Sequence, residues 1–325
     1  MRKILLASTA LVAVAGVSAA NAEITLSGGY DFTYTSVSDN QTDSAAAGEN
    51  GTSMGSDIDL GAKYSTTTDT GLSISVSYDI DGDTGTVTVG GDFGTLSMDD
   101  GNEAMGVGGG DADSVENMGI TGDNDITYSG GEAINGGMIA YSNSFSGIEF
   151  GVGFGDGGSA SDADETSYGV SYSSSVNGAD FSISYAAAST GSANSADASA
   201  DLNASSLAVG ITVGSISLDM ARNAQKSDRN DGTAAAGQDD LSSTNFGLTY
   251  AASDSLTLQA ASVAADGKEG GVDGYKYDES AYGVAYTVAS GVTLYASYSD
   301  FTQSGGTTNT PVSGSGTTVN LDISF

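Results

Sequence analysis

The chain has 325 residues, including 48 glycines, one proline and no cysteine, histidine or tryptophan. Its eight bases and 42 acids give a net charge of −34, which argues against a nucleic-acid partner and favours cations. Without cysteine there is no disulfide-stapled scaffold, and without histidine or cysteine the common catalytic base and thiol nucleophile are missing, so we expect no enzyme.

The N-terminal residues have the pattern of a secretory signal peptide. A basic start (MRK) precedes an apolar stretch and the small-x-small sequence Ala20-Asn21-Ala22. Cleavage after Ala22 would leave residues 23–325 with six bases and a net charge of −36. Beyond residue 22 no apolar run approaches the roughly 18 residues of a spanning helix. The exported chain is therefore predicted to be soluble or a β-barrel.

Apolar and polar residues alternate with a period of two along the exported chain, as expected for strands with one apolar and one polar face. In residues 24–34 the apolar positions include Ile24, Leu26, Tyr30 and Phe32. We predict sixteen strands, at residues 23–35, 55–66, 71–80, 85–90, 94–99, 135–144, 147–156, 165–176, 179–189, 202–213, 215–224, 241–251, 254–265, 276–288, 291–301 and 316–325.

The connections between these strands alternate between long and short. Residues 36–54 and 100–134 are long, for example, whereas residues 67–70 and 177–178 are short. An even number of strands, short turns at one end and long loops at the other are typical of an outer-membrane barrel. The fold class predicted is an all-β, 16-stranded antiparallel transmembrane β-barrel. A soluble β-sandwich is the alternative, but it would usually contain continuous buried runs.

The last nine residues, TTVNLDISF, form a strictly alternating strand. Val319, Leu321, Ile323 and Phe325 share one face, and polar residues occupy the other. A barrel needs its last strand to pair with its first, because no free edge is tolerated within a membrane. We therefore expect residues 316–325 to close the barrel, with Phe325 in the aromatic girdle near the inner interface.

One long connection is strongly acidic: residues 99–125 carry eight carboxylates and no base. The stretches around it, GDFGTLSMDDGNEA and SGIEFGVGFGDG, resemble the general porins of Gram-negative bacteria, most closely the alphaproteobacterial (Rhodobacter-like) type. The C-terminal strand resembles the signature that the barrel insertion machinery reads in such proteins. The resemblance covers residues 23–325 by architecture and only these stretches by motif.

In such porins the third outer loop folds into the barrel and narrows the pore. The resemblance thus implies a constriction loop at residues 99–134, with Glu103, Asp111, Asp113 and Glu116 facing the pore. It also implies a homotrimer embedded in outer-membrane lipid. An outward, solvated acidic loop is the alternative, because glycines such as those at 108–110 serve flexibility equally well.

In such porins the carboxylates of the constriction loop face a cluster of Arg and Lys on the barrel wall, and this cluster is nearly absent here. No Lys or Arg occurs between Lys63 and Arg222. Side chains at even spacing along a strand share a face, which we call parity. Lys63 has the parity of Asp57 and Asp59, so it should face the lumen with them. Arg222 has the parity of the apolar residues of its strand and should lie at the rim. A pore of single acidic sign is therefore expected, with cation preference as the consequence.

Clustered carboxylates at Asp228, Asp231, Asp239 and Asp240 offer oxygens for Ca²⁺, but the EF-hand spacing is missing and a solvated acidic surface loop is the favoured interpretation. No other cofactor is expected. The function predicted is an outer-membrane channel of a Gram-negative bacterium for passive diffusion of small hydrophilic solutes and cations. A closed barrel with a structural or adhesive role is the alternative.

Overall fold

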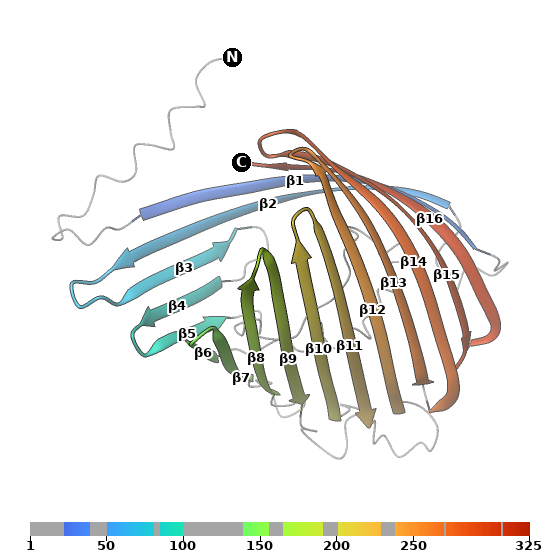
Figure 1. The fold of residues 1–325 in the computed structure, drawn as a ribbon, viewed down its shortest axis with the longest axis horizontal. Coiled ribbons are helices and arrows are strands. Elements are labelled where there is room, and N and C mark those ends of the chain that lie inside the picture. The colour runs from blue at the N-terminus through green and yellow to red at the C-terminus, as the bar shows by residue number, and fades with distance from the viewer. Residues whose placement is uncertain are drawn as a thin grey trace.

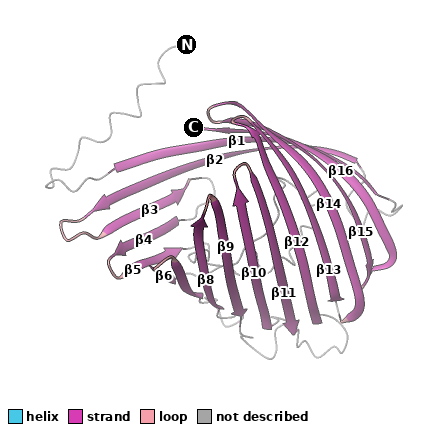
Figure 2. Cartoon of the chain, viewed as in Figure 1, coloured by secondary structure: helices cyan, strands magenta, loops and turns pink. Residues whose placement is uncertain are grey.

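The computed structural model describes residues 23–39, 51–80, 85–99, 139–155, 165–190, 201–228, 238–269, 271–306 and 308–325. Every regular element in these ranges is a β-strand (Figure 2). The same residues contain no helix that is long and apolar enough to cross a membrane. The strands are β1 (Glu23–Asp39), β2 (Gly51–Thr67), β3 (Ser73–Asp79), β4 (Gly85–Gly91), β5 (Gly94–Asp99), β6 (Ile139–Phe145), β7 (Ile148–Gly155), β8 (Glu165–Val176), β9 (Ala179–Thr190), β10 (Asp201–Val213), β11 (Ile216–Asp228), β12 (Gln238–Ser253), β13 (Leu256–Glu269), β14 (Val272–Ala289), β15 (Val292–Gly305) and β16 (Thr308–Ser324).

The strands form one closed antiparallel barrel in which each strand pairs with its neighbours in the chain (Figure 1). The seam is closed by β1 and β16, which pair from Gly29 with Ser324 to Asp39 with Gly314. Phe325 continues the seam, because its backbone N–H donates to the Gly28 carbonyl and its carbonyl oxygen accepts from the Gly28 N–H, both at 2.9 Å. The predicted sixteen-stranded barrel is confirmed, as is the closing role of the last strand.

The two ends of the barrel differ. One end, called the turn end, holds Glu23, Phe325 and the tight hairpins, such as those between β8 and β9 and between β10 and β11 (Figure 1). Asn177 and Gly178 form one of these hairpins with φ of 53° and 83°, the left-handed conformation of a type I′ turn, whose twist matches the flanking strands. The opposite end, called the loop end, holds the longer connections. In outer-membrane barrels the short turns face the periplasm.

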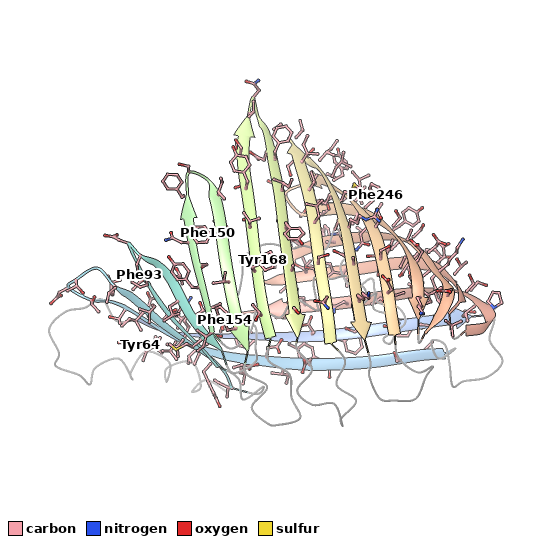
Figure 3. The ribbon with its side chains drawn as sticks, turned by 90° about the horizontal axis from the view of Figure 1, so that it is seen from below. Tyr64, Phe93, Phe150, Phe154, Tyr168 and Phe246 are labelled. Atoms are coloured by element: carbon pink, nitrogen blue, oxygen red, sulfur yellow. The ribbon has the colours of Figure 1, made fainter. Side chains whose placement is uncertain are left out.

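The outward face carries an apolar belt. Outward residues of strands around the barrel include Leu26, Ile58, Phe150, Leu218 and Leu248, which are between 40% and 62% exposed. Aromatic side chains are frequent on this face, and six of them are labelled in Figure 3. Such exposure of large apolar groups is costly in water, but it suits a wall that meets lipid.

The inward face is built from small and polar side chains. One lateral row runs through Gly169, Ala186, Ser206, Asn223 and Ser243 on β8 to β12. Ala186 and Asn223 are fully buried, and Ser206 and Ser243 are 1% and 2% exposed. The side chains of this part of the wall are therefore short.

Several strands extend further toward the loop end than predicted. β14 begins at Val272 instead of residue 276, and β16 begins at Thr308 instead of residue 316. At this end the alternation is inverted: Tyr275 and Tyr277 point inward, next to Phe301 and Val312, and all four are 2% or 3% exposed. The rings of Tyr277 and Phe301 stack with centroids 6.1 Å apart. These segments of strand were not predicted, because the search looked for apolar residues on the outward face and here they lie on the inward face.

Candidate functional site: the charged wall of the pore

Three carboxylates lie side by side on the inward face at the seam. Asp31 of β1 is directly paired with Asp322 of β16 on one side and with Asp57 of β2 on the other. Directly opposed residues have Cβ atoms about 5 Å apart. Like charges at such positions are mutually repulsive, so this row concentrates negative potential at one place on the lumen wall.

More inward carboxylates continue the acidic wall next to this row. Asp59 follows Asp57 on β2, and its carboxylate lies over Gly29, where an added Cβ would be 3.5 Å from Asp59 Oδ2. Asp79 of β3 is paired with Gly61. Lys63 is on the same inward face of β2, paired with Thr25 and Ser77. The wall of β16 and β1 to β3 is therefore predominantly, though not wholly, acidic.

The rest of the barrel adds separate carboxylates to the inward face. Glu149 of β7 accepts a hydrogen bond from Ser171 Oγ at 3.3 Å, and Asp180 of β9 accepts one from Ser175 Oγ. Asp219 of β11 lies over Gly210. Glu279 of β14 accepts a hydrogen bond from the Tyr277 hydroxyl at 2.8 Å and is 8% exposed. Acidic groups are thus found around much of the lumen wall.

The bases have the opposite orientation. Arg222 and Lys226 of β11, Lys268 of β13 and Lys276 of β14 share the parity of the outward apolar residues of their strands, and they lie toward the loop end. Among the described residues, Lys63 is the one base on the inward face. The inward charges are therefore mostly acidic, whereas the outward face carries four of the five described bases together with carboxylates such as Asp240, Asp266 and Asp278.

The barrel fold agrees with the comparisons to known proteins. A family model described as Gram-negative porin matches residues 7–320. The chain belongs to the Gram-negative porin family. No curated protein matches the sequence at a significant level.

Solved structures show the same fold. An anion-selective porin from Comamonas acidovorans is 15% identical, with a TM-score of 0.62 and coverage of 94% of this chain and 100% of that chain. A porin refined at 1.8 Å resolution is 18% identical, with a TM-score of 0.60 and coverage of 93% and 100%. The trimer form of OmpT, an outer membrane protein of Vibrio cholerae, is 13% identical, with a TM-score of 0.63 and coverage of 94% and 99%. At these identities the likeness concerns the fold.

Of the site residues predicted for this porin, Asp57, Asp59 and Lys63 lie together on the inward face of β2. Four others, Glu103, Asp111, Asp113 and Glu116, lie outside the described residues. They belong to residues 99–134, of which the structure describes only Asp99. A constriction formed by both groups stays a prediction.

The calcium candidates of the porin are only partly described. Asp231 and the side chains of Asp228 and Asp239 lie outside the described part. Asp240 faces outward, paired with Lys226 and Lys268, so its nearest cross-strand neighbours are bases. The described residues contain no group of three or more acidic side chains arranged to hold a metal ion. Calcium binding stays untested.

Asp322 was missed as a pore residue by the sequence analysis. Its inward parity is visible in TTVNLDISF, but its position beside Asp31 depends on the register of the β1–β16 seam. Asp322 could have been found by comparing the inward acidic residues of the first and last strands that lie equally far from the turn end.

Proposed function

We propose that this porin forms a water-filled channel for passive diffusion of small hydrophilic solutes, with a preference for cations and without enzymatic activity. The observation that carries the proposal is the predominantly acidic charge of the inner wall. Asp31, Asp57 and Asp322 form one acidic row inside the barrel, whereas Arg222, Lys226, Lys268 and Lys276 face outward. Fixed charges of one sign along a pore attract counter-ions and repel co-ions.

The mechanism needs no binding step with a defined stoichiometry. A hydrated cation that enters the lumen is attracted to the carboxylates of β1, β2 and β16 and then leaves along the potential gradient. In water the attraction of one cation to one carboxylate about 6 Å away is roughly 0.7 kcal/mol, which is weak enough for rapid release. Carboxylates more than about 10 Å away are largely screened in 0.1 M salt, so the inner wall should decide selectivity.

Recordings from the refolded chain in planar bilayers would test this function. We expect discrete conductance steps and, in a potassium chloride gradient, a reversal potential on the cation-selective side. The preference should weaken as the salt concentration rises, because screening shortens the reach of the wall charges. A barrel that inserts and does not conduct would favour a structural or adhesive role, and an anion-selective reversal potential would contradict the charge argument.

We also propose that residues 99–134 narrow the pore. Support comes from the inner wall of β6 to β10, whose buried side chains include Ala140, Ser167, Ala186, Ala188, Ala204 and Ser206, each between 0% and 6% exposed. Side chains of this size leave space next to the wall for another segment of the chain. The acidic composition of residues 99–125 would add to the potential of the lumen.

Neutralisation of Glu103, Asp111, Asp113 and Glu116 to Gln or Asn is expected to lower cation preference and leave the barrel intact. The matched control replaces Asp228, Asp231, Asp239 and Asp240 with Asn, an equal change of charge at another loop. If the segment narrows the pore, the first set should reduce the permeability ratio several-fold more than the second, because unscreened charges must be near the ion path. Equal effects on the reversal potential would contradict an inward loop.

A homotrimer in the outer membrane is the assembly we propose, supported by the trimeric OmpT among the structural neighbours. Export through a signal peptide at residues 1–22, assembly through the C-terminal strand and a relationship to the alphaproteobacterial type are consistent with the family, and they rest on the sequence alone.

A further inference from the structure

The first residues of β1 extend past the end of β16 at the turn end of the barrel (Figure 1). β1 is paired with β2 from Glu23, opposite Ser65, onward. On its other side the pairing with β16 begins only at Gly28, opposite Phe325. Within the described residues, the stretch from Glu23 to Ser27 therefore has a neighbouring strand on one side only.

The backbone groups that face the open side follow from the hydrogen bonds of the seam. In an antiparallel strand the N–H and C=O of one residue point to the same side, and those of the next residue point to the other side. Gly28 directs both groups to Phe325, so Ile24 and Leu26 direct theirs to the same side. Among the described residues these groups of Ile24 and Leu26 have no hydrogen-bond partner. We call residues 23–27 with these groups the open edge.

The side chains of the open edge do not prevent pairing. Ile24 and Leu26 are 52% and 62% exposed on the outward face, and Thr25 lies on the inward face beside Lys63. An unpaired edge is a template for another strand, and proteins usually block such edges with Lys, Pro or a bulge. The segment EITLS contains neither Lys nor Pro, and its pairing with β2 is regular. The open edge is therefore available to an added strand.

The geometry of the open edge restricts what can bind there. Its hydrogen-bonding groups alternate along an extended backbone, and another extended backbone matches them by adding as a strand. Such a strand would place every second side chain beside Ile24 and Leu26, so apolar residues at alternate positions fit the outward side. The net charge of −34 attracts a basic segment and repels a second copy of the same chain. In outer-membrane barrels the turn end faces the periplasm.

We propose that the open edge of β1 binds an extended basic segment of a periplasmic polypeptide as an added antiparallel strand, with apolar residues of that segment beside Ile24 and Leu26. The antiparallel direction continues the pattern of every strand pair in the barrel. The added strand would continue the wall beyond Phe325, so this interaction does not depend on ion conduction. The conductance of the pore should be the same with and without the bound segment.

The test uses the refolded chain of residues 23–325 in detergent and a short fluorescent peptide in which valine alternates with lysine. Fluorescence anisotropy measures binding against a blank of detergent alone, and hydrogen exchange measures protection of the β1 amides. The bound peptide should slow exchange at Ile24 and Leu26 at least about tenfold, because their N–H groups gain acceptors. Exchange at Thr25 and Ser27, whose groups face β2, should change less.

Two N-methylated peptides of equal charge separate strand addition from charge attraction. In an antiparallel pair, directly opposed residues share a face and exchange their hydrogen bonds, so the valines of the peptide bond to Ile24 and Leu26. Methylation of the valine nitrogens should weaken binding at least about tenfold, whereas methylation of the lysine backbone nitrogens should weaken it less than about threefold. Equal binding of the two methylated peptides, or a greater loss for the lysine-methylated one, would overturn the proposal.

Leu26→Pro tests the edge from the side of the barrel. It removes an N–H that faces away from β2 and places a ring at the open edge, so the β1–β2 hydrogen bonds are retained. We expect unchanged heat-modifiable mobility and conductance, and peptide binding at least about tenfold weaker. Leu26→Ala, the matched control, keeps the N–H and should weaken binding about threefold or less.

A strand-forming extension after Phe325 is a second variant, and it replaces no residue of the barrel. The extension would continue β16 beside Leu26 and Ile24 and occupy the open edge from within the chain, so the free peptide should no longer bind. Undiminished binding by this variant or by Leu26→Pro contradicts the proposal. Equal binding of a valine–glutamate peptide contradicts a basic partner. A peptide-free dimer that Leu26→Pro dissociates would replace the proposal with a contact between copies of the chain.

Discussion

Deletion of Phe325 is expected to prevent stable barrel assembly. The residue contributes two backbone hydrogen bonds with Gly28, each 2.9 Å long, at the last position of the β1–β16 seam. Its ring covers Gly28, where an added Cβ would lie 2.6 Å from Phe325 Cζ. In a membrane each unsatisfied backbone group costs several kcal/mol, and the deletion would leave both Gly28 groups without these partners. Loss of the heat-modifiable form on SDS gels would be the measurement.

The matched control is Phe325→Leu, which retains both backbone hydrogen bonds and an apolar side chain. We expect this variant to assemble, with a modest loss of stability from the smaller ring contact. A one-residue insertion before Val319 should be as damaging as the deletion, because it turns Val319, Leu321 and Ile323 toward the lumen. Normal yield of the deletion variant in the outer membrane would show that the seam does not depend on Phe325.

Replacement of Asp31, Asp57 and Asp322 together by Asn is expected to abolish most of the cation preference. The three carboxylates form one row on the lumen wall. An attraction of roughly 0.7 kcal/mol per carboxylate at about 6 Å corresponds to about threefold in local cation concentration for each charge. Allowing for screening, we expect the ratio of cation to anion permeability to fall about tenfold in 0.1 M salt and less in 1 M salt.

The control for this variant removes the same number of negative charges from the outward face of the barrel. Asp240, Asp266 and Asp278 share the outward parity and are exposed, so their replacement by Asn removes three charges outside the lumen. Reversal potentials in the same salt gradient should be nearly unchanged by the outward set. Similar shifts for both sets would mean that the overall field, and not the inner row, determines selectivity.

Local periodicity is the part of this fold that could be predicted from the sequence. Each strand with outward apolar residues was found, because a side chain on a strand is assigned to a face by its neighbours two positions away. The same argument predicted the inward orientation of Asp57 and Asp59 and the outward orientation of Arg222. The number of strands followed from counting these segments.

The loop ends of β13 to β16 were predicted too short, for a physical reason. Above the apolar belt the outward positions meet water or head groups, so they carry residues such as Asp266, Lys276 and Asp300. Tyr275 and Tyr277 occupy inward positions instead. Backbone pairing continues through this change, but the pattern that signals a lipid-facing strand does not.

The acidic row could not be predicted for a different reason. Asp322 and Asp31 are adjacent only because the first and last strands pair in one particular register. A shift of that pairing by two residues would keep every side chain on its proper face and would separate the two carboxylates. Parity is a local property of the chain, whereas lateral alignment at the seam is a property of the closed barrel.

The connectivity of the barrel also determines the order in which it can form. Fifteen of the lateral contacts join strands that follow one another in the chain, whereas the seam joins β1 to β16 across almost the entire sequence. Hairpins close short loops at little entropic cost, but the seam must bring together two segments nearly 300 residues apart. Contacts of such high contact order form slowly. We therefore expect the joining of the two edges to be the slow step of folding. Until it occurs, the unpaired backbones of β1 and β16 should be the part of the molecule most exposed to mispairing with another chain.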